Sequence, residues 1–391
     1  MTEQIPQRRI PELDGLRGMA ILLVMVGHYF SVPGVGAVSL LNGYWFRLGW
    51  TGVDLFFVLS GFLIGGILLD ARGSSNYFKT FYARRFFRII PLYYAWILLY
   101  VVLAPVVRMF FSDRIGPVQR VDGSILAHLF FLQNFHEFLK SGASFWWFSS
   151  TWSLAVEEQF YLVAPLLVRY LSKRSLATIL VLVTFTAPLL RFVVRNYSAD
   201  GPWLAYRLMP CRADALAVGM LAALIWKSPA ARAWMEKYTL FLYALFTSLF
   251  YGVAYLWRWS SDPMLLLTQT AGYTVIALFF AVLMLLVLTE RTFFLAAVMR
   301  LGFLRDIGGI SYCVYIIHTA VYFFCHQIIL GALPAVTDVP AAAVTMLAAL
   351  LTYAIAKLSW KYFEQPQIRR GHAFQYEYME PKYLQPTESA T

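Results

Sequence analysis

Ten apolar segments, each close to the length needed to cross a membrane, dominate this sequence of 391 residues. Hydrophobic residues make up 60% of the chain and charged residues only 14%, against roughly 25% charged residues in soluble domains. Segments of this kind predict an all-α, polytopic membrane protein with about ten transmembrane helices. The predicted spans are Leu16–Phe30, Gly52–Leu69, Ile89–Val107, Trp152–Tyr170, Leu176–Val194, Ala213–Trp226, Thr239–Trp257, Met264–Leu288, Ile310–Leu330 and Pro340–Trp360.

The distribution of basic residues predicts the orientation of these spans. With ten spans and a cytoplasmic N-terminus, 22 of the 32 Lys and Arg residues fall on the cytoplasmic side. The positive-inside rule therefore favours both termini in the cytoplasm, with a bacterial inner (plasma) membrane as the natural setting. The apolar stretch Ile125–Phe135 is too short to cross and is interpreted as a re-entrant or interfacial helix. The net charge of +11 is interpreted as membrane topology rather than as nucleic-acid binding.

The ends of the chain are more polar than its body. Residues 1–365 are predicted to form one transmembrane domain, and residues 366–391 a polar cytoplasmic tail whose last residues look flexible. The Gln4–Arg9 arm is expected at the surface, and no cleavable signal pattern follows. The three cysteines, Cys211, Cys313 and Cys325, have neither metal-ligand spacing nor a disulfide pattern, and no metal site is predicted.

The first predicted helix carries two ionisable residues in a mostly apolar run, LDGLRGMAILLVMVGHYF. Arg17 and His28 are 11 residues apart, so on an α-helix they share one face and lie about 16 Å apart along the axis. Ionisable groups within a membrane helix normally face a bundle interior, a cavity or a partner. The alternative is that each side chain reaches its own membrane interface.

A second set of polar residues is predicted at the outward ends of the spans. It comprises His28, Asp54, Glu157, Glu158, Arg212 and Asp214. Carboxylates near a histidine can fix its tautomer and raise its basicity, which suits general-base catalysis. The alternative is that these residues are interfacial anchors and helix caps.

A basic cluster is predicted on the inner side, in YARRFFRIIPLYY. Arg84, Arg85 and Arg88 precede a helix that Pro91 helps to start, and Arg85 and Arg88 share a face. Such a pair could bind the phosphates of a cytoplasmic nucleotide-type donor through bidentate contacts, or it could be ordinary positive-inside charge.

The remaining histidines and tryptophans carry weaker signals. His318 lies near the middle of the ninth span, where an ionisable residue suggests function, although a satisfied core histidine is the more common case. No charged constellation can be assigned to the others, His128, His136, His326 and His372. Trp146, Trp147 and Trp152 fit an aromatic belt better than a sugar-stacking platform.

Six motifs together resemble the membrane-bound acyltransferase-3 family, whose members O-acylate carbohydrates and some small-molecule acceptors. In order, they are LDGLRGMAILLVMVGH, GVDLFFVLSGFLI, YARRFFRIIPLY, TWSLAVEEQFYL, RADALAVG and ISYCVYIIH. The resemblance covers Pro11 to Phe363 and implies the stand-alone form of the family, without an extracellular hydrolase-like domain.

The resemblance implies roles for particular residues. His28 matches the essential histidine of the family, as general base or acyl carrier, and Arg17 its partner arginine. Glu157 matches the glutamate of the WSLxxE element, and Arg85 and Arg88 the RxxR element that holds acyl-CoA. We expect Arg84 to join that donor site. The acceptor pocket is expected to include Asp54, Trp152, Ser153, Glu158, Arg212, Asp214 and His318.

The expected reaction moves an acyl group, most simply acetyl, from cytoplasmic acyl-CoA to a hydroxyl of a carbohydrate or glycan near the outer face of the membrane. Acyl-CoA is then a donor substrate, with no permanently bound cofactor, and the glycan acceptor includes lipid-linked forms. His28 would be oriented by a carboxylate such as Glu157. Acceptor identity and oligomeric state stay open.

Two other classes of function are compatible with the same residues. One is a proton-coupled or lipid-linked-sugar transporter that uses Asp54, Glu157 and His318 as a relay, although no internal repeat supports it. The other is a non-catalytic membrane assembly partner, in which conservative changes at His28 would be silent.

Overall fold

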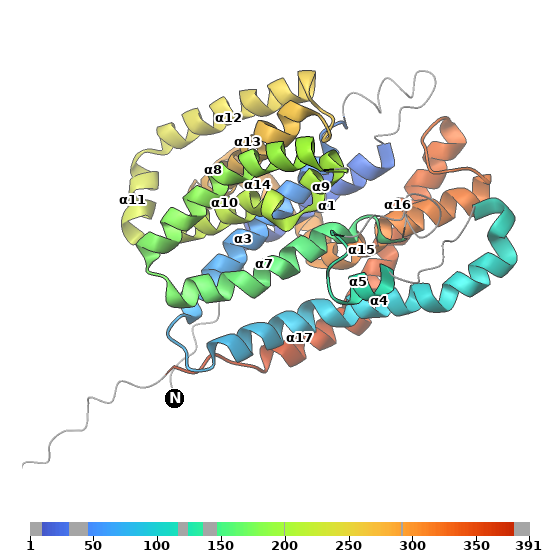
Figure 1. Cartoon of the computed structure of the whole chain (residues 1–391), viewed down its shortest axis with the longest axis horizontal. Coiled ribbons are helices and arrows are strands. Elements are labelled where there is room, and N and C mark those ends of the chain that lie inside the picture. Colours follow the sequence, from blue (N-terminus) through green and yellow to red (C-terminus); the bar gives the residue numbers. More distant parts are fainter. Residues whose placement is uncertain are drawn as a thin grey trace, which may run out of the picture.

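The computed structural model describes residues 10–30, 46–115, 124–135, 147–198, 200–290 and 292–378, and within these ranges every regular element is a helix. The helices pack into one bundle (Figure 1). The long helices are α1 (Pro11–Phe30), α3 (Gly52–Ala71), α4 (Tyr77–Ile115), α7 (Thr151–Tyr170), α8 (Lys173–Tyr197), α10 (Met209–Lys227), α12 (Thr239–Trp259), α13 (Tyr273–Thr289), α15 (Gly302–Leu330) and α16 (Val339–Ser359). The predicted surface arm Gln4–Arg9, His136 and Trp146 lie outside the described residues.

Short elements join the long ones. They are η1 (Gly49–Thr51), α5 (Ser124–Leu129), α9 (Gly201–Arg207), α11 (Pro229–Lys237), η2 (Thr268–Gly272), α14 (Phe294–Met299), η3 (Trp360–Glu364) and α17 (Gln365–His372). The single turns of π-helix η2 and η3 run directly into α13 and α17, so that residues 268–289 and 339–372 each form one continuous rod.

Nine helices among the described residues are long and apolar enough to cross a membrane, and they correspond to nine of the ten predicted spans. The tenth prediction, Trp152–Tyr170, coincides with α7, which is 20 residues long. Its Glu157, Glu158 and Arg169 make it more polar than the other nine. The prediction of an all-α polytopic membrane protein is confirmed. Ile125–Phe135 contains only the six-residue α5 followed by turns, as expected for a segment too short to span.

Glycines allow the central helices to approach closely. A Cβ added to Gly61 of α3 would lie 2.1 Å from the carbonyl oxygen of Leu216 on α10, and one on Gly219 of α10 would lie 2.1 Å from that of Val58. The crossing of α1 with α15 is equally tight, because a Cβ on Gly18 would lie 2.1 Å from the carbonyl oxygen of Leu304. Small residues drive helix association in lipid because they let backbones pack against each other.

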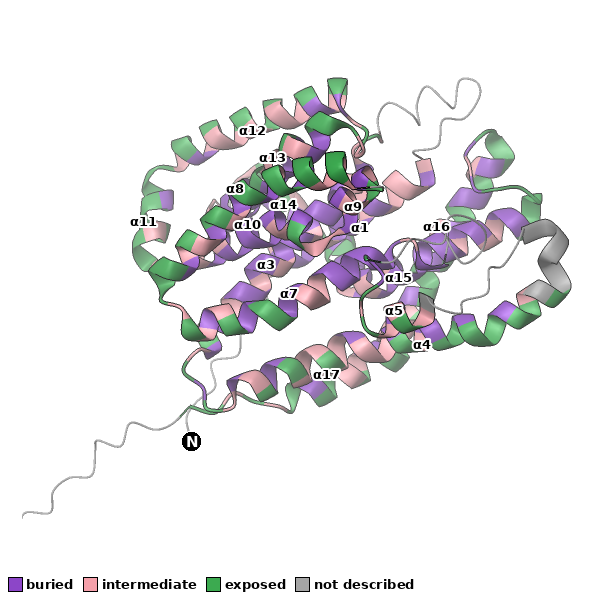
Figure 2. Cartoon of the chain, in the orientation of Figure 1, coloured by how far each residue is buried: buried purple, intermediate pink, exposed green. Residues whose placement is uncertain are grey.

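Burial separates the core helices from the lipid-facing ones. Helices α3, α10, α13 and α15 are largely buried, whereas α8 and α12 expose most of their length (Figure 2). The exposed side chains on these outer helices are themselves apolar, including Phe185, Leu189, Leu240 and Phe250. Apolar side chains that face outward along a whole helix are expected where the surrounding solvent is lipid.

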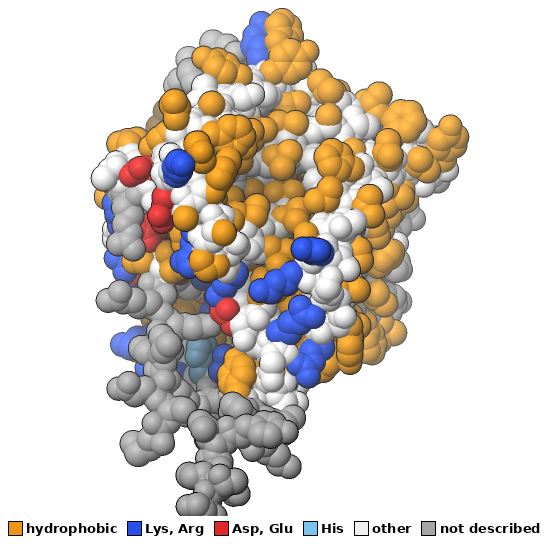
Figure 3. Space-filling view, turned by 90° about the vertical axis from the view of Figure 1, so that its left-hand side faces the viewer, with side chains coloured by type: hydrophobic (Ala, Val, Ile, Leu, Met, Phe, Trp, Pro, Cys, Tyr) orange, Lys and Arg blue, Asp and Glu red, His pale blue; other side chains and the backbone are white. Residues whose placement is uncertain are grey.

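One end of the bundle is rich in basic side chains (Figure 3). The junctions between α3 and α4, α7 and α8, and α10 and α11 meet at this end. The name basic end is used below for the part that carries Arg72, Arg169, Lys173, Lys227 and Arg232.

The segment that follows the last span packs back onto the basic end. Helix α17 lies along α4 (Figure 1). Beyond it the carbonyl oxygen of Gln375 accepts hydrogen bonds from Asn76 Nδ2, at 2.8 Å, and from Thr80 Oγ1. The main chain of Glu377 exchanges two more hydrogen bonds with Ser75 and Asn76. Residues 366–378 of the predicted polar tail are therefore part of the packed structure.

Candidate functional site

Two histidines from opposite ends of the sequence meet within the bundle. His28 occupies the last turn of α1 and His318 lies near the middle of α15. The Nε2 atom of His318 is 2.9 Å from Nδ1 of His28, and the ring centroids are 5.0 Å apart. His318 is fully buried, whereas His28 is partly exposed. The pair therefore has one sheltered member and one member that a substrate could reach.

The backbone around His318 fixes which ring nitrogens carry protons. Nδ1 of His318 lies 2.8 Å from the carbonyl oxygen of Tyr315 and 3.1 Å from that of Val314. Carbonyl oxygens only accept, so this nitrogen must be the N–H donor, and Nε2 of the neutral ring is then an acceptor. Nδ1 of His28 must in turn donate to it. The carbonyl of Val24, one turn earlier on α1, also accepts from the His28 ring. The lone pair of His28 is left on Nε2, the position that suits a base.

Hydrogen bonds from tyrosines hold the two histidine helices in register. The Tyr29 hydroxyl donates to the carbonyl oxygen of His318 at 3.1 Å, and the Tyr322 hydroxyl donates to that of Tyr29 at 3.0 Å. The phenol of Tyr315 forms a short hydrogen bond with Ser153 near the start of α7. The ring of Tyr315 lies 6.0 Å from that of His318. Tyr315 thus connects Ser153 to the histidine pair.

A buried ion pair lies near Trp152, between α3 and α10. Arg212 Nη2 of α10 contacts Asp54 Oδ1 of α3 at 2.6 Å, and both side chains are almost fully buried. The guanidinium of Arg212 sits 4.0 Å from the ring centroid of Tyr273 and 6.0 Å from that of Trp152. Among the described residues, Nε and Nη1 of Arg212 have no hydrogen-bond partner. This pair connects α3 to α10.

Asp214 belongs to a second ion pair, with an arginine that sequence reasoning did not single out. Arg191 Nη1 of α8 lies 2.9 Å from Asp214 Oδ2, and Thr274 donates to the same oxygen at 2.6 Å. Arg191 also donates to the carbonyl oxygens of Cys211 and Gln269. The signal was present in the sequence, because Arg191 is a charge inside a predicted apolar span.

Neither Glu157 nor Glu158 is the hydrogen-bond partner of His28 Nδ1, which lies 2.9 Å from Nε2 of His318. The Ser60 hydroxyl donates to Glu157 Oε1 at 2.5 Å, and the positive charges of Arg85 and Arg17 act on the same carboxyl. Glu158 adjoins Glu157 and is also attracted by Arg85. Both carboxyls therefore lie within reach of the Arg85 charge, and Glu157 also within reach of that of Arg17. The position expected for a carboxylate that orients His28 is occupied by His318.

The reason for the difference is depth along α7. Helix α7 begins at Thr151, so Glu157 is about 9 Å further along the axis. Ser60 and Asp54 are likewise about 9 Å apart along α3. The three residues of the predicted relay each contact a different partner. Asp54 pairs with Arg212, Glu157 accepts from Ser60, and His318 bonds to His28.

The three arginines before the third span face two directions. Arg85 lies over the Tyr161 ring at 5.5 Å, and Arg88 over the Trp360 ring at 5.7 Å. The charges of Arg17 and Arg85 both act on Arg88, so these three form one group. Arg84 points elsewhere: its Nε donates to the carbonyl oxygen of Phe374 at 2.8 Å and its guanidinium lies over Tyr376. Arg84 contacts the C-terminal segment and not the Arg17–Arg85–Arg88 group.

The predicted geometry of α1 is confirmed. Arg17 and His28 lie on one unbroken helix, which places them about 16 Å apart along its axis. Arg17 also contacts Asp14, one turn earlier, at 3.3 Å. A group of arginines therefore adjoins one end of the helix whose other end carries the histidine pair.

The other histidines have local packing roles where the structure describes them. His326 Nε2 lies 2.9 Å from the Thr345 hydroxyl, and the His128 ring packs 4.4 Å from that of Phe148. Within the described ranges, no three His, Cys, Asp or Glu side chains come together in the manner of metal ligands. The cysteines there are free thiols.

Comparison with known families gives a match that covers most of the chain. Residues 10–356 match the acyltransferase-3 model, which is described as an acyltransferase domain. No solved structure matches at a significant level.

Curated relatives match over a similar range. The peptidoglycan O-acetyltransferase OatA of Listeria monocytogenes is 27% identical over 95% of this chain and 57% of its own length. The O-acetyltransferase OatA of Staphylococcus aureus is 26% identical over 93% of this chain and 58% of its own length. YrhL of Bacillus subtilis is 33% identical over 56% of this chain and 34% of its own length. The chain thus spans about half the length of the curated relatives it matches, or less.

Proposed function

The chain belongs to the acyltransferase-3 family, and on that premise we propose that it is an O-acetyltransferase of the bacterial inner (plasma) membrane. It moves an acyl group, most simply acetyl, from acyl-CoA on the cytoplasmic side to a hydroxyl group of a glycan near the outer face. The relatives OatA of Listeria monocytogenes and of Staphylococcus aureus, both O-acetyltransferases by name and the first named for peptidoglycan, support a carbohydrate acceptor.

The observation that carries this proposal is the protonation pattern of the histidine pair. His318 accepts the Nδ1 proton of His28 and leaves the lone pair of His28 on Nε2. In the proposed reaction Nε2 takes the proton of the acceptor hydroxyl as its oxygen attacks the thioester carbonyl carbon. The carbon–sulfur bond breaks, and the departing thiolate recovers that proton from His28 as free CoA thiol. His318 acts as the positioning residue throughout.

The arginine group supports a donor that arrives from the basic end. Arg17, Arg85 and Arg88 offer guanidinium groups suited to phosphate oxygens. Glu157 and Glu158 sit close to Arg85 of this group. The thioester arm of a donor held there by its phosphates would extend about 16 Å along α1, from Arg17 to His28.

The acceptor side is assigned to the aromatic and charged residues around Trp152. Trp152 and Tyr206 have ring centroids 4.7 Å apart, and Arg212 adjoins both. Aromatic rings with a nearby polar group suit the apolar face and hydroxyls of a sugar. The Arg212–Asp54 and Arg191–Asp214 pairs keep α3, α8 and α10 in place beneath these rings.

The test is a transfer assay on the purified full chain in lipid nanodiscs. It uses radiolabelled acetyl-CoA and a panel of glycans, and it follows ester formation. His28→Asn is expected to lower the rate by ~10²–10⁴-fold, the usual contribution of a positioned base. The matched control is His326→Asn, which alters a buried histidine of α15 that bonds to Thr345.

Two results would contradict the proposal. The first is full activity of His28→Asn, and the second is movement of a sugar substrate across the membrane without any acyl-CoA. Trapping of an acetylated His28 in the absence of acceptor would replace the general base by an acyl carrier.

A further inference from the structure

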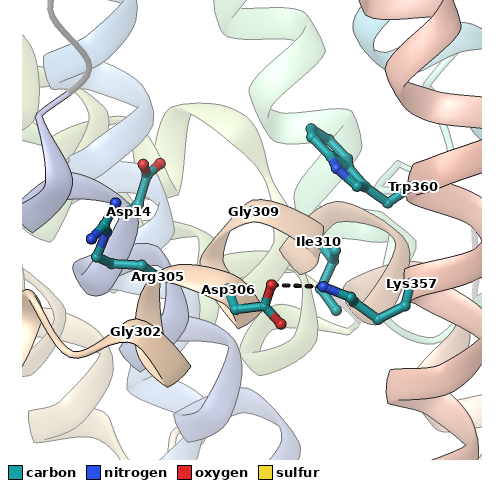
Figure 4. A pocket seen from close by; sticks show the side chains of 8 residues that line it. All are labelled: Asp14, Gly302, Arg305, Asp306, Gly309, Ile310, Lys357 and Trp360. Atoms are coloured by element: carbon teal, nitrogen blue, oxygen red, sulfur yellow. Dashed lines mark hydrogen bonds and ion pairs between the residues drawn. The ribbon is translucent and has the colours of Figure 1, made fainter.

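A cavity of about 350 Å³ opens at the bundle end that holds the arginine group. Its walls come from the start of α1, the first turns of α15 and the junction of α16 with η3 (Figure 4). Asp14 and Arg305 lie on one side of it, Lys357 reaches across to Asp306, and the Trp360 indole forms the opposite rim. None of the motifs recognised in the sequence contains Arg305, Lys357 or Trp360.

Two carboxylates and two cations line the cavity, and three of these four side chains have charged partners. Asp306 is held by Lys357 at 2.7 Å and by the Tyr353 hydroxyl at 2.7 Å. Asp14 contacts Arg17 at 3.3 Å. Among the described residues, the exposed Arg305 guanidinium has neither a hydrogen-bond nor an ion-pair partner. An anionic group in the cavity would therefore meet one uncompensated arginine, which suits a phosphate.

The indole of Trp360 adds a flat apolar surface to this cation. The Trp360 side chain is partly exposed, and Arg88 approaches its ring at 5.7 Å. An aromatic ring beside a positively charged group is a general platform for a nucleobase attached to a phosphate. A lipid headgroup would use the cation but would have no need of the ring.

The position of the cavity connects it with the proposed donor path. Asp14 of its wall is one turn before Arg17 on α1, and Arg88 lies behind Trp360. The distance from Asp14 to His28 along α1 is about 21 Å. A ligand anchored in the cavity would thus lie beside the Arg17–Arg85–Arg88 group, on the side away from the histidine pair.

We infer that this cavity binds the phosphorylated nucleoside end of the acyl-CoA donor, with a phosphate on Arg305 and the base on Trp360. This inference rests on the proposed function, because it adds a binding site for the nucleoside end of the donor of that reaction. Arg85 and Arg88 then hold the phosphates that follow along the same molecule, and Lys357 keeps Asp306 from repelling the bound phosphate.

The experiment measures equilibrium binding of adenosine 3′,5′-bisphosphate and of acetyl-CoA to the full chain in nanodiscs of neutral lipid. Arg305→Gln is expected to weaken both by about tenfold, the effect of one lost charge-assisted contact. Trp360→Leu is expected to weaken both, and Trp360→Phe to restore binding because it keeps a ring. The matched control is Arg300→Gln, since Arg300 contacts Glu12 and does not line the cavity.

The outcomes separate this inference from the proposed function. If Arg305→Gln and Trp360→Leu bind both ligands as Arg300→Gln does, the cavity assignment is overturned, while acetyl transfer by the unaltered chain would leave the proposed function standing. If the unaltered chain binds the bisphosphate through Arg305 and Trp360 but transfers no acetyl group, the proposed function fails and the nucleotide site stands.

A lipid headgroup is tested in the same preparation. Phosphatidylglycerol is added to the nanodiscs, and displacement of the bisphosphate that requires Arg305 would show a lipid phosphate in the cavity and overturn the nucleotide assignment. Unchanged bisphosphate binding in that lipid would support it.

Discussion

Replacing His318 by methionine removes the acceptor of the His28 Nδ1 proton. The 2.9 Å contact between the rings is lost, and an apolar side chain of similar size fills the fully buried space. A buried donor left without its acceptor costs about 1–3 kcal/mol. The Val24 carbonyl remains as a second acceptor, so we expect the lower part of this range, about 1–2 kcal/mol.

This free energy lowers the equilibrium fraction of His28 rings that keep the proton on Nδ1 and the lone pair on Nε2. At 1.36 kcal/mol per factor of ten, the turnover of His318→Met should fall about 5- to 30-fold. The apparent affinity for acetyl-CoA should stay within about twofold, because His318 is remote from the arginine group and acts on the chemical step.

The assay compares His318→Met with His318→Gln. A glutamine can place its amide oxygen near the original position of Nε2, and it should therefore recover part of the lost turnover. Thermal unfolding of both variants in detergent checks that they fold equally well. If His318→Gln were as slow as His318→Met at equal stability, or if His318→Met kept full turnover, the assignment of His318 as the acceptor would be refuted.

Three further substitutions test the packing and the charge pairs. Gly219→Val should lower the thermal midpoint by several degrees, since its Cβ would lie 2.1 Å from the Val58 carbonyl oxygen, whereas Gly66→Ala meets only a side-chain atom at 3.8 Å and should be silent. Asp54→Asn should destabilise the fold by about 3–5 kcal/mol, because it leaves the buried Arg212 charge uncompensated; a destabilisation below about 1 kcal/mol would contradict this. Arg84→Gln should speed amide hydrogen exchange in the segment at residues 374–377 with little effect on acetyl-CoA affinity; a loss of affinity as large as that of Arg85→Gln would place Arg84 in the donor site after all.

The elements that could be predicted from the sequence are those that depend on local periodicity and composition. Long apolar runs predicted ten spans that the structure describes as helices, nine of which are long and apolar enough to cross, because a membrane span needs a fixed length of apolar chain. The shared face of Arg17 and His28 followed from 11 residues of helical pitch. The Arg85–Arg88 pair, three residues apart, was likewise fixed by geometry within one helix.

What could not be predicted are the neighbours that each helix face meets. His28 and His318 are 290 residues apart, and nothing in the local pattern of either helix encodes their contact. The sequence suggested a carboxylate such as Glu157 as the partner of His28, because the start of a span gives neither its depth relative to other helices nor its azimuth; His318 holds that position. Arg84 was placed with Arg85, although the main chain of residues 374–377 folds back to meet it. These contacts depend on tertiary packing.

A neutral histidine in the place of a carboxylate has a physical reason in a membrane. An ionised carboxylate buried beside His28 would need its own cation, as Asp54 needs Arg212. The positive charge of that cation would lower the basicity of the imidazole. His318 accepts the Nδ1 proton without any buried charge, and its own proton is held by the carbonyls of Tyr315 and Val314. The imidazolium that forms on His28 is then stabilised less than in a pair with a carboxylate. It should give its proton up readily to the departing thiolate, so that substituting His318 by Glu should slow transfer rather than speed it. Faster transfer in His318→Glu would show that a stronger base, and not a neutral partner, is what this site lacks.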